Sequence, residues 1–201
     1  MEKNIVLLSI KQLKAVKYIR ILLFILVLNF CLTCGAIAQN LELTNLVLDS
    51  QNGSIQVRFG LDVKDPDLLK DFLQDDGALL QLRCQIKLYR QRSFWWNELL
   101  AKKTVDYKLK GNPLTQKYWL KDSRKEKFVQ KKDLAALLKS SWQHMHVGLG
   151  PWIQLTKGEA YSLYLKVSMK RIDVPKWLQR ALFFWSWDVL PENTYRLDFS
   201  Y

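Results

Sequence analysis

The sequence is poor in cysteine and histidine, the residues that build most disulfide and metal sites. It holds three cysteines and two histidines among 201 residues. Two of the cysteines, Cys31 and Cys34, fall in an N-terminal segment that we expect to be removed, so only Cys84 stays. A single cysteine cannot form an internal disulfide, and packing alone must hold the remaining chain together. Cys84 alternates with apolar neighbours, which predicts an inert buried thiol.

The chain also lacks the short motifs that assemble a catalytic group. It contains no Gly-x-Ser-x-Gly turn, no Ser-x-x-Lys pair and no His-Glu-x-x-His helix. His144 and His146 have no nearby cysteine or carboxylate to complete four metal ligands, and a position at a helix C-terminus explains them better. The segment 148–151 reads as a turn without the lysine of a phosphate-binding loop. We therefore predict no catalytic residue, no metal, no cofactor and no enzymatic activity.

The N-terminal 38 residues contain the three parts of a secretory signal. A basic segment at 11–20 precedes an uninterrupted apolar run at 21–28, and small residues follow at Ala36 and Ala38. We expect cleavage after Ala38. The protein is then periplasmic or secreted.

Two alternatives to cleavage stay open. The segment 21–38 is about as long as the shortest membrane-spanning helices, so it is also a candidate for an uncleaved inner-membrane anchor. Lipidation of Cys34 is the second alternative. No internal repeat, low-complexity tract or linker divides the rest of the chain, which predicts one exported β-rich domain at 39–201.

Positive charge is concentrated in one part of the chain. Residues 39–201 contain 26 Lys and Arg against 18 Asp and Glu, and the window 102–132 alone contains 11 against 3. One interpretation is a solvated face that keeps the protein soluble. The other is a surface that meets an anion, either lipid headgroups or an acidic partner.

Alternation of apolar and polar residues is the clearest periodic signal. Residues 54–63 alternate without error, and the turn Asn52-Gly53 pairs them with 41–48. About seven such segments predict a mainly β (α+β) domain in which antiparallel sheets pack face to face, as in a β-sandwich. The remaining segments are 82–88, 105–109, 116–120, 161–169 and 195–201.

We expect about three helices on the connections. Asp65-Pro66 opens the first, which ends near Gly77, and 131–144 carries apolar residues at helical spacing. A third begins at 173 and continues to about 185. The lysine-rich stretch 121–132 is predicted to be an exposed loop.

Arginine and aromatic residues cluster at 90–97, with Arg90 and Arg92 beside Trp95 and Trp96. In an extended segment the two tryptophans point to opposite faces, so at most one is fully buried. We expect the other at the surface, with one of the arginines stacked on it. Export removes nucleic acid as a partner and leaves a membrane interface or the rim of the core.

A second cluster lies near the C-terminus, where Lys176 and Arg180 accompany Trp185 and Trp187. Tryptophan with basic residues on a short apolar helix is typical of an interfacial membrane contact. A helix docked across the edge of the sheet is the alternative, because sheet edges need cover.

Several segments, taken in order, resemble a known family. They are Tyr89 to Trp96, Val105 to Leu109, Asn112 to Tyr118, the strand at Tyr161, and Val174-Pro175 followed by Trp185 and Trp187. This order is similar to the uncharacterised bacterial exported family called domain of unknown function 4390. The resemblance implies a Gram-negative envelope protein whose gene often lies beside a sensor histidine kinase of the nitrogen-regulation type. It implies no reaction, cofactor or catalytic residue.

We therefore predict a non-enzymatic exported interaction module of the bacterial cell envelope, an accessory to a membrane sensor kinase. The first alternative is a peripheral membrane or lipid-binding protein that uses 177–187 on an anionic membrane surface. The second is a carrier of a small apolar ligand, which needs an apolar cavity between the sheets.

Overall fold

The structure is a computed structural model that describes residues 40–74, 78–125, 128–174, 180 and 188–201. The chain separates into the units Met1–Ala38 and Gln39–Tyr201, and the described residues all belong to the second. The predicted cleavage after Ala38 and the alternative anchor thus concern residues outside the described part. Within that part, no helix has the length and apolar character needed to span a membrane.

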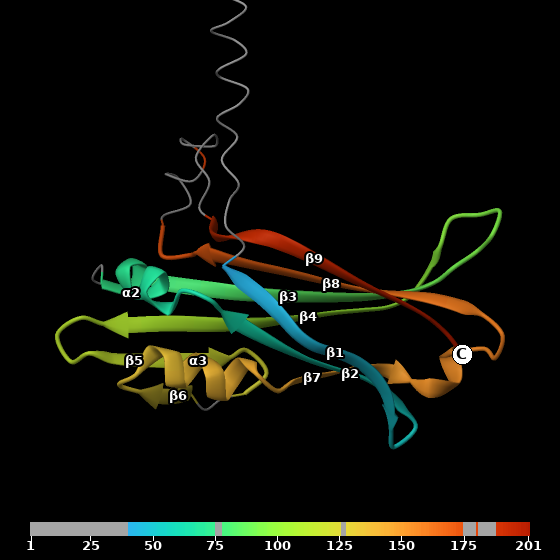
Figure 1. Cartoon of the computed structure of the whole chain (residues 1–201), viewed down its shortest axis with the longest axis horizontal. Coiled ribbons are helices and arrows are strands. Elements are labelled where there is room, and N and C mark those ends of the chain that lie inside the picture. Colours follow the sequence, from blue (N-terminus) through green and yellow to red (C-terminus); the bar gives the residue numbers. More distant parts are fainter. Residues whose placement is uncertain (1–39, 75–77, 126–127, 175–179, 181–187) are drawn as a thin grey trace, which may run out of the picture. The chain divides into compact units, whose positions relative to one another are not determined.

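Two antiparallel sheets form the domain (Figure 1). The smaller sheet has the order β1 (Leu41–Gln51), β2 (Ser54–Val63) and β7 (Met145–Pro151). The larger sheet has the order β6-β5-β4-β3-β8-β9; in chain order these strands are β3 (Leu79–Arg90), β4 (Glu98–Asn112), β5 (Lys117–Asp122), β6 (Phe128–Lys131), β8 (Ala160–Arg171) and β9 (Asp188–Ser200). This architecture confirms the predicted sandwich-like, mainly β fold.

The core lies between the two sheets and is built by strict alternation along the strands. In β3, Leu82, Cys84 and Ile86 are buried, and their sequence neighbours face the opposite side. In β2, the apolar residues Ile55 to Val63 face the same core. All buried apolar residues of the described part lie between Leu41 and Leu190. All described strands except β6 thus contribute to one continuous core.

Within the described residues, two α-helices and a short 3-10 helix connect strands. Helix α2 (Pro66–Gln74) begins at the predicted position, where Asp65 accepts hydrogen bonds from the backbone N–H groups of Asp67 and Leu68 at 3.1 and 3.2 Å. Helix α3 (Leu134–Trp142) packs four buried side chains on the core, and η1 (Trp152–Gln154) follows β7.

Two sequence predictions about these connections need correction. Helix α3 ends at Trp142, so His144 and His146 lie beyond the helix and not in its last turn. The predicted loop 121–132 contains the end of β5 and the edge strand β6. The predicted third helix, from 173 to about 185, falls mostly outside the described residues, among which Arg180 is helical.

The predicted turn at 148–151 is also wrong, because these residues end strand β7. Ile55 pairs with Gly150 and Gln56 with Gly148, so Leu149 is the extra residue of a bulge. Gly150 adopts a φ of 142°, a conformation that side chains disfavour. The glycines at 148 and 150 therefore flank a bulge, and Pro151 ends the strand.

Candidate functional site

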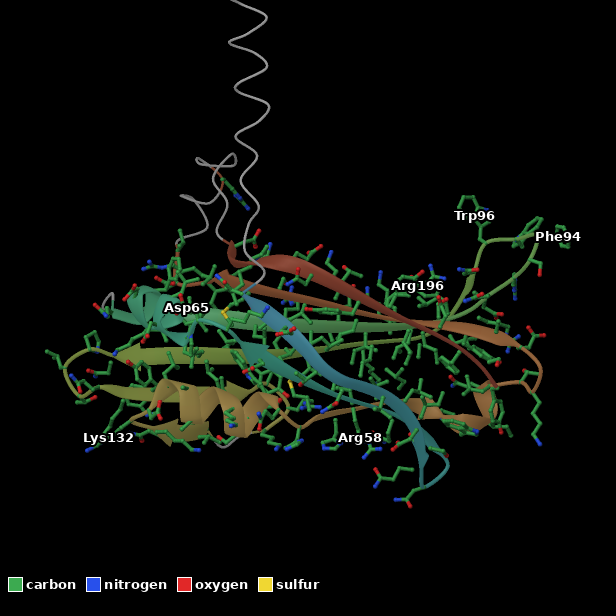
Figure 2. All side chains as sticks on the ribbon, viewed as in Figure 1. Arg58, Asp65, Phe94, Trp96, Lys132 and Arg196 are labelled. Atoms are coloured by element: carbon green, nitrogen blue, oxygen red, sulfur yellow. The ribbon has the colours of Figure 1, made fainter. Side chains whose placement is uncertain are left out.

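The connection between β3 and β4 forms the most exposed apolar site of the described residues. Phe94, Trp95 and Trp96 are 98%, 73% and 87% exposed. The hairpin extends beyond the end of the larger sheet (Figure 1), and Phe94 and Trp96 point away from the rest of the domain (Figure 2). We call these three residues the aromatic tip. Large exposed rings in a row are rare on soluble proteins and typically mark a binding site.

The base of this hairpin is held firmly by hydrogen bonds and ion pairs. Arg92 forms an ion pair with Glu98 across the loop, and Arg90 lies 3.5 Å from the same carboxylate. Arg90 also donates to the carbonyl oxygen of Gln154 at 3.4 Å. The backbone N–H of Gln91 donates to the carbonyl of Ala160 at 2.8 Å. These contacts fix the strands below the tip, so the rings are presented on a defined support.

The structure corrects how the sequence analysis placed these side chains. Trp95 and Trp96 lie in a bend, not in an extended strand, and both are exposed. Arg90 and Arg92 pair with Glu98, whereas the cation–π contacts of the described residues involve Arg124 and Arg196. The predicted stacking of an arginine on a tryptophan is therefore wrong.

The second predicted cluster lies almost entirely outside the described residues. Lys176, Trp185 and Trp187 are not described, and Arg180 is exposed. The described structure thus brings together Arg90, Arg92, Trp95 and Trp96 of the predicted surface. The predicted interaction surface did not include Phe94, although this ring stands beside Trp95 in the aromatic cluster at 90–97.

A polar cluster centred on Arg124 connects residues of β4, β5 and β7. Its guanidinium group donates to both carboxylate oxygens of Asp122 at 2.8 and 3.0 Å, to the hydroxyl of Tyr107 at 2.9 Å and to the carbonyl of His146 at 2.9 Å. Burial raises the pKa of Tyr107 to about 12. Burial opposes ionisation of Asp122, but hydrogen bonds and charge from Arg124 outweigh it and lower the pKa of that carboxyl. Arg124 thus links three strands.

The two histidines border the same cluster without forming a metal site. His144 and His146 line a cavity of about 540 Å³ together with Arg124 and Ser140. The described residues contain no group of three or more His, Cys, Asp or Glu side chains arranged to hold a metal ion. The guanidinium of Arg124 is occupied by its protein partners, which makes this cavity a poor anion site.

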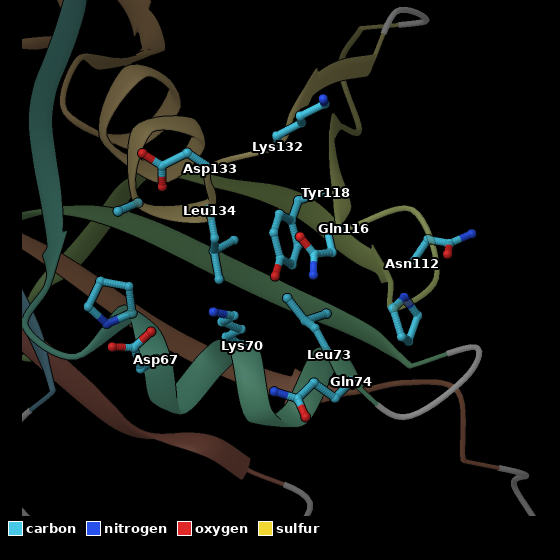
Figure 3. Close-up of a pocket in the computed structure, with 13 residues that line it drawn as sticks. Asp67, Lys70, Leu73, Gln74, Asn112, Gln116, Tyr118, Lys132, Asp133 and Leu134 are labelled. Atoms are coloured by element: carbon cyan, nitrogen blue, oxygen red, sulfur yellow. The ribbon is translucent and has the colours of Figure 1, made fainter.

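A cavity of about 620 Å³ lies between α2, the start of α3 and the β4–β5 turn (Figure 3). The ring of Tyr118 is directed into it, with Leu73 and Leu134 on its walls (Figure 3). Lys70 and Lys132 are balanced by Asp67 and Asp133. The lining mixes apolar with charged and polar side chains, which is not the apolar cavity between the sheets that a carrier of an apolar ligand needs.

Cys84 is buried, as its alternation with apolar neighbours predicted. Cys84 is fully buried on β3, and burial raises the pKa of its thiol to about 12. A thiol with such a pKa is protonated at physiological pH and does not act as a nucleophile.

The comparison with protein families confirms the family resemblance found in the sequence. A family model described as domain of unknown function (DUF4390) matches residues 38–198. The chain therefore belongs to this family. The match includes the hairpin with the aromatic tip and all but the end of β9. Neither the curated proteins nor the solved structures include a significant match.

Proposed function

We propose that this domain is a non-enzymatic interaction module of the bacterial cell envelope that docks on a protein partner through the aromatic tip. The observation that carries the proposal is the exposure of three consecutive rings, between 73% and 98%, on a hairpin whose base is fixed. Binding energy at protein interfaces is concentrated in a few residues, of which tryptophan is among the most frequent. A rigidly supported tip also loses little conformational entropy on binding.

A protein cleft suits this tip better than the hydrocarbon of a bilayer. Residues 92–97 lie beyond the paired ends of β3 and β4, and Asn97 accepts a hydrogen bond from the backbone N–H of Arg92. Unpaired backbone groups are costly in lipid, whereas a protein partner supplies donors and acceptors. Glu98 lies at the base of the loop and pairs with both Arg90 and Arg92, so one positive charge stays at the base. The tip itself consists of three uncharged rings.

The partner we propose is the periplasmic part of a membrane sensor histidine kinase. The family resemblance supports this choice, because genes of the family often lie beside such a kinase. The proposed role of the domain is that of an accessory that contacts the sensor. No residue of the described structure is assigned a catalytic role in this proposal.

Titration of residues 39–201 against the purified kinase ectodomain tests the proposal. We expect the double variant Trp95→Ser/Trp96→Ser to weaken binding at least about 30-fold, because loss of a hot-spot tryptophan costs about 2 kcal/mol or more. The stability of the domain should stay unchanged, since the rings lie outside the core.

The matched control is Leu114→Ser. Leu114 is 94% exposed in the β4–β5 turn, so this variant also removes a large apolar side chain from the surface. It should bind like the wild type. Equal binding by the wild type, the double tryptophan variant and Leu114→Ser would exclude the aromatic tip as the binding site. Absence of any affinity in the wild type would exclude the kinase as partner.

A further inference from the structure

One face of the larger sheet carries a group of lysines that have no ion-pair partner among the described residues. On β3, β4 and β5 the core residues alternate with residues that face the side away from the smaller sheet. Helices α2 and α3 lie on the core side, to which they contribute Leu73 and Leu138. We call the following six residues the lysine face: Lys87, Lys102, Lys108, Lys110, Lys117 and Lys121.

The carboxylates on this side of the sheet are already paired with other cations. Asp106 binds Arg83 at 2.8 Å, and Asp198 binds Arg196 at 2.9 Å. The other pairs are Lys166 with Glu192 at 2.6 Å and Lys170 with Asp188 at 3.1 Å. Within the described part of the chain, no lysine of the lysine face lies within ion-pair distance of a carboxylate. The positive charge is thus uncompensated.

Strand register places like charges directly opposite one another. Lys87 pairs with Lys102 between β3 and β4, and Lys108 pairs with Lys121 between β4 and β5. Like charges at directly opposed positions destabilise an antiparallel sheet. A merely soluble surface has no need of this arrangement, since one acidic residue in either pair would remove the repulsion. An anion bound between the lysines also removes it.

Two aromatic residues lie among these lysines. Trp119 on β5 is half-buried and pairs with Lys110, and Phe128 on β6 is 59% exposed and pairs with Lys121. Neighbouring strands are about 4.8 Å apart, and alternate residues of one strand about 6.8 Å. The face is therefore an open array of ammonium groups with rings among them. Tryptophan and lysine side chains together are typical of the headgroup layer of a membrane.

We propose that the lysine face binds the surface of a membrane that contains anionic phospholipids. The lysines lie over three neighbouring strands, which matches a surface of many phosphates better than a single ligand. The window 102–132, whose charge excess the sequence shows, supplies five of the six lysines. The inference is independent of the aromatic tip, which lies at the end of the sheet and presents three uncharged rings. The sheet face meets lipid, and the tip meets protein.

Flotation of residues 39–201 with vesicles tests the inference. Vesicles of phosphatidylcholine with phosphatidylglycerol should bind the wild type, and vesicles of phosphatidylcholine alone should not. The variant Lys121→Glu should bind at least about tenfold more weakly, because each lysine near an anionic surface contributes roughly a fivefold gain in partitioning. Salt at about 0.5 M should release the wild type.

The same variant separates a binding defect from misfolding. The introduced carboxylate would face Lys108 across the strands and form an ion pair, so Lys121→Glu should raise the unfolding temperature while it weakens flotation. The matched control is Lys139→Glu, which makes the same charge change at an exposed position on α3. It should keep nearly all of the binding.

Two results would overturn the inference. One is a wild type that does not float with phosphatidylglycerol vesicles, as an acidic protein partner for this face would predict. The other is an equal loss of binding in Lys121→Glu and Lys139→Glu. Binding would then depend on the net charge of the protein and not on the position of the lysine face. The tip variant Trp95→Ser/Trp96→Ser should float like the wild type, so failure of this inference leaves the proposed function testable by its own titration.

Discussion

Replacement of Trp142 by alanine is expected to lower the free energy of unfolding by about 3–5 kcal/mol, the cost of truncating a fully buried tryptophan. Trp142 ends helix α3, is 0% exposed and lies in the core between the sheets. Its removal leaves a cavity that rigid strands on both sides cannot fill. Urea denaturation of residues 39–201, followed by circular dichroism, measures the effect.

The variant Trp142→Phe is the matched control. The indole Nε1–H of Trp142 is buried without a hydrogen-bond partner among the described residues. Phenylalanine retains most of the apolar contact and removes this unpaired donor, whose burial costs about 1–3 kcal/mol. The loss should therefore be much smaller than for alanine. A cost below about 1 kcal/mol for Trp142→Ala would contradict the packing of α3 on the core.

Loss of the Arg124 side chain is expected to have the second largest effect. Arg124→Ala removes the hydrogen-bond donor from the hydroxyl of Tyr107, the carboxylate of Asp122 and the carbonyl of His146. The side chain of Asp122 is 11% exposed, so its charge would remain in a poorly solvated position. We expect a loss of about 2–3 kcal/mol at neutral pH, because truncating one partner of such a pair leaves the other unsatisfied.

This loss should depend on pH through Asp122. In the wild type the pKa of Asp122 is lowered, so its ion pair adds stability above the unfolded pKa of about 4, and this part is lost as pH falls through the folded pKa. In Arg124→Ala the side-chain hydrogen bonds and the charge of Arg124 are lost, whereas the backbone N–H of residue 124 still donates to Asp122, so the pKa of the carboxyl rises toward its unfolded value. The difference between the two proteins should shrink as pH falls from about 7 toward about 3.

Arg83→Ala serves as the control for Arg124→Ala. Arg83 pairs with Asp106 at 2.8 Å, but its own side chain is 53% exposed on the outer face of the sheet. Water replaces such a partner easily, and exposed pairs contribute about 0–1 kcal/mol. An equal loss for the two variants would show that Arg124 has no linking role between the strands.

The sequence predicted the strands that have one wet face. In β2 and β8 the alternation is complete, and the turn Asn52-Gly53 has the positive φ values of a tight hairpin. These predictions succeed because one sheet face meets the core and the other meets water, which imposes a period of two on the residues. The N-cap of α2 at Asp65 was also predicted correctly, because capping depends only on residues close in sequence.

Strands β6 and β7 were missed for physical reasons. Strand β6 is a short edge strand whose residues 128–130 are all exposed, so no alternation exists to be read. In β7, Gly148 and Gly150 flank the bulge residue Leu149, and only the pairing with β2 reveals this bulge. Both strands exist because of tertiary pairing, which propensity and periodicity cannot report.

The candidate site was only half predictable. The cluster at 90–97 stood out by composition, but the exposure of Phe94, Trp95 and Trp96 depends on a bend at the end of two long strands. The excess of positive charge in residues 102–132 could be counted from the sequence alone. The location of five of its lysines on one face follows from the register of β3, β4 and β5, which no single segment encodes.

Photo-crosslinking in intact cells tests the central claim, that the aromatic tip contacts a protein of the envelope, most directly. A benzoylphenylalanine probe at position 94 should give a defined protein adduct that contains the sensor kinase. The same probe at position 114, on an equally exposed turn, should give none. Absence of a protein adduct at 94, an adduct with lipid alone, or equal adducts at both positions would contradict the account.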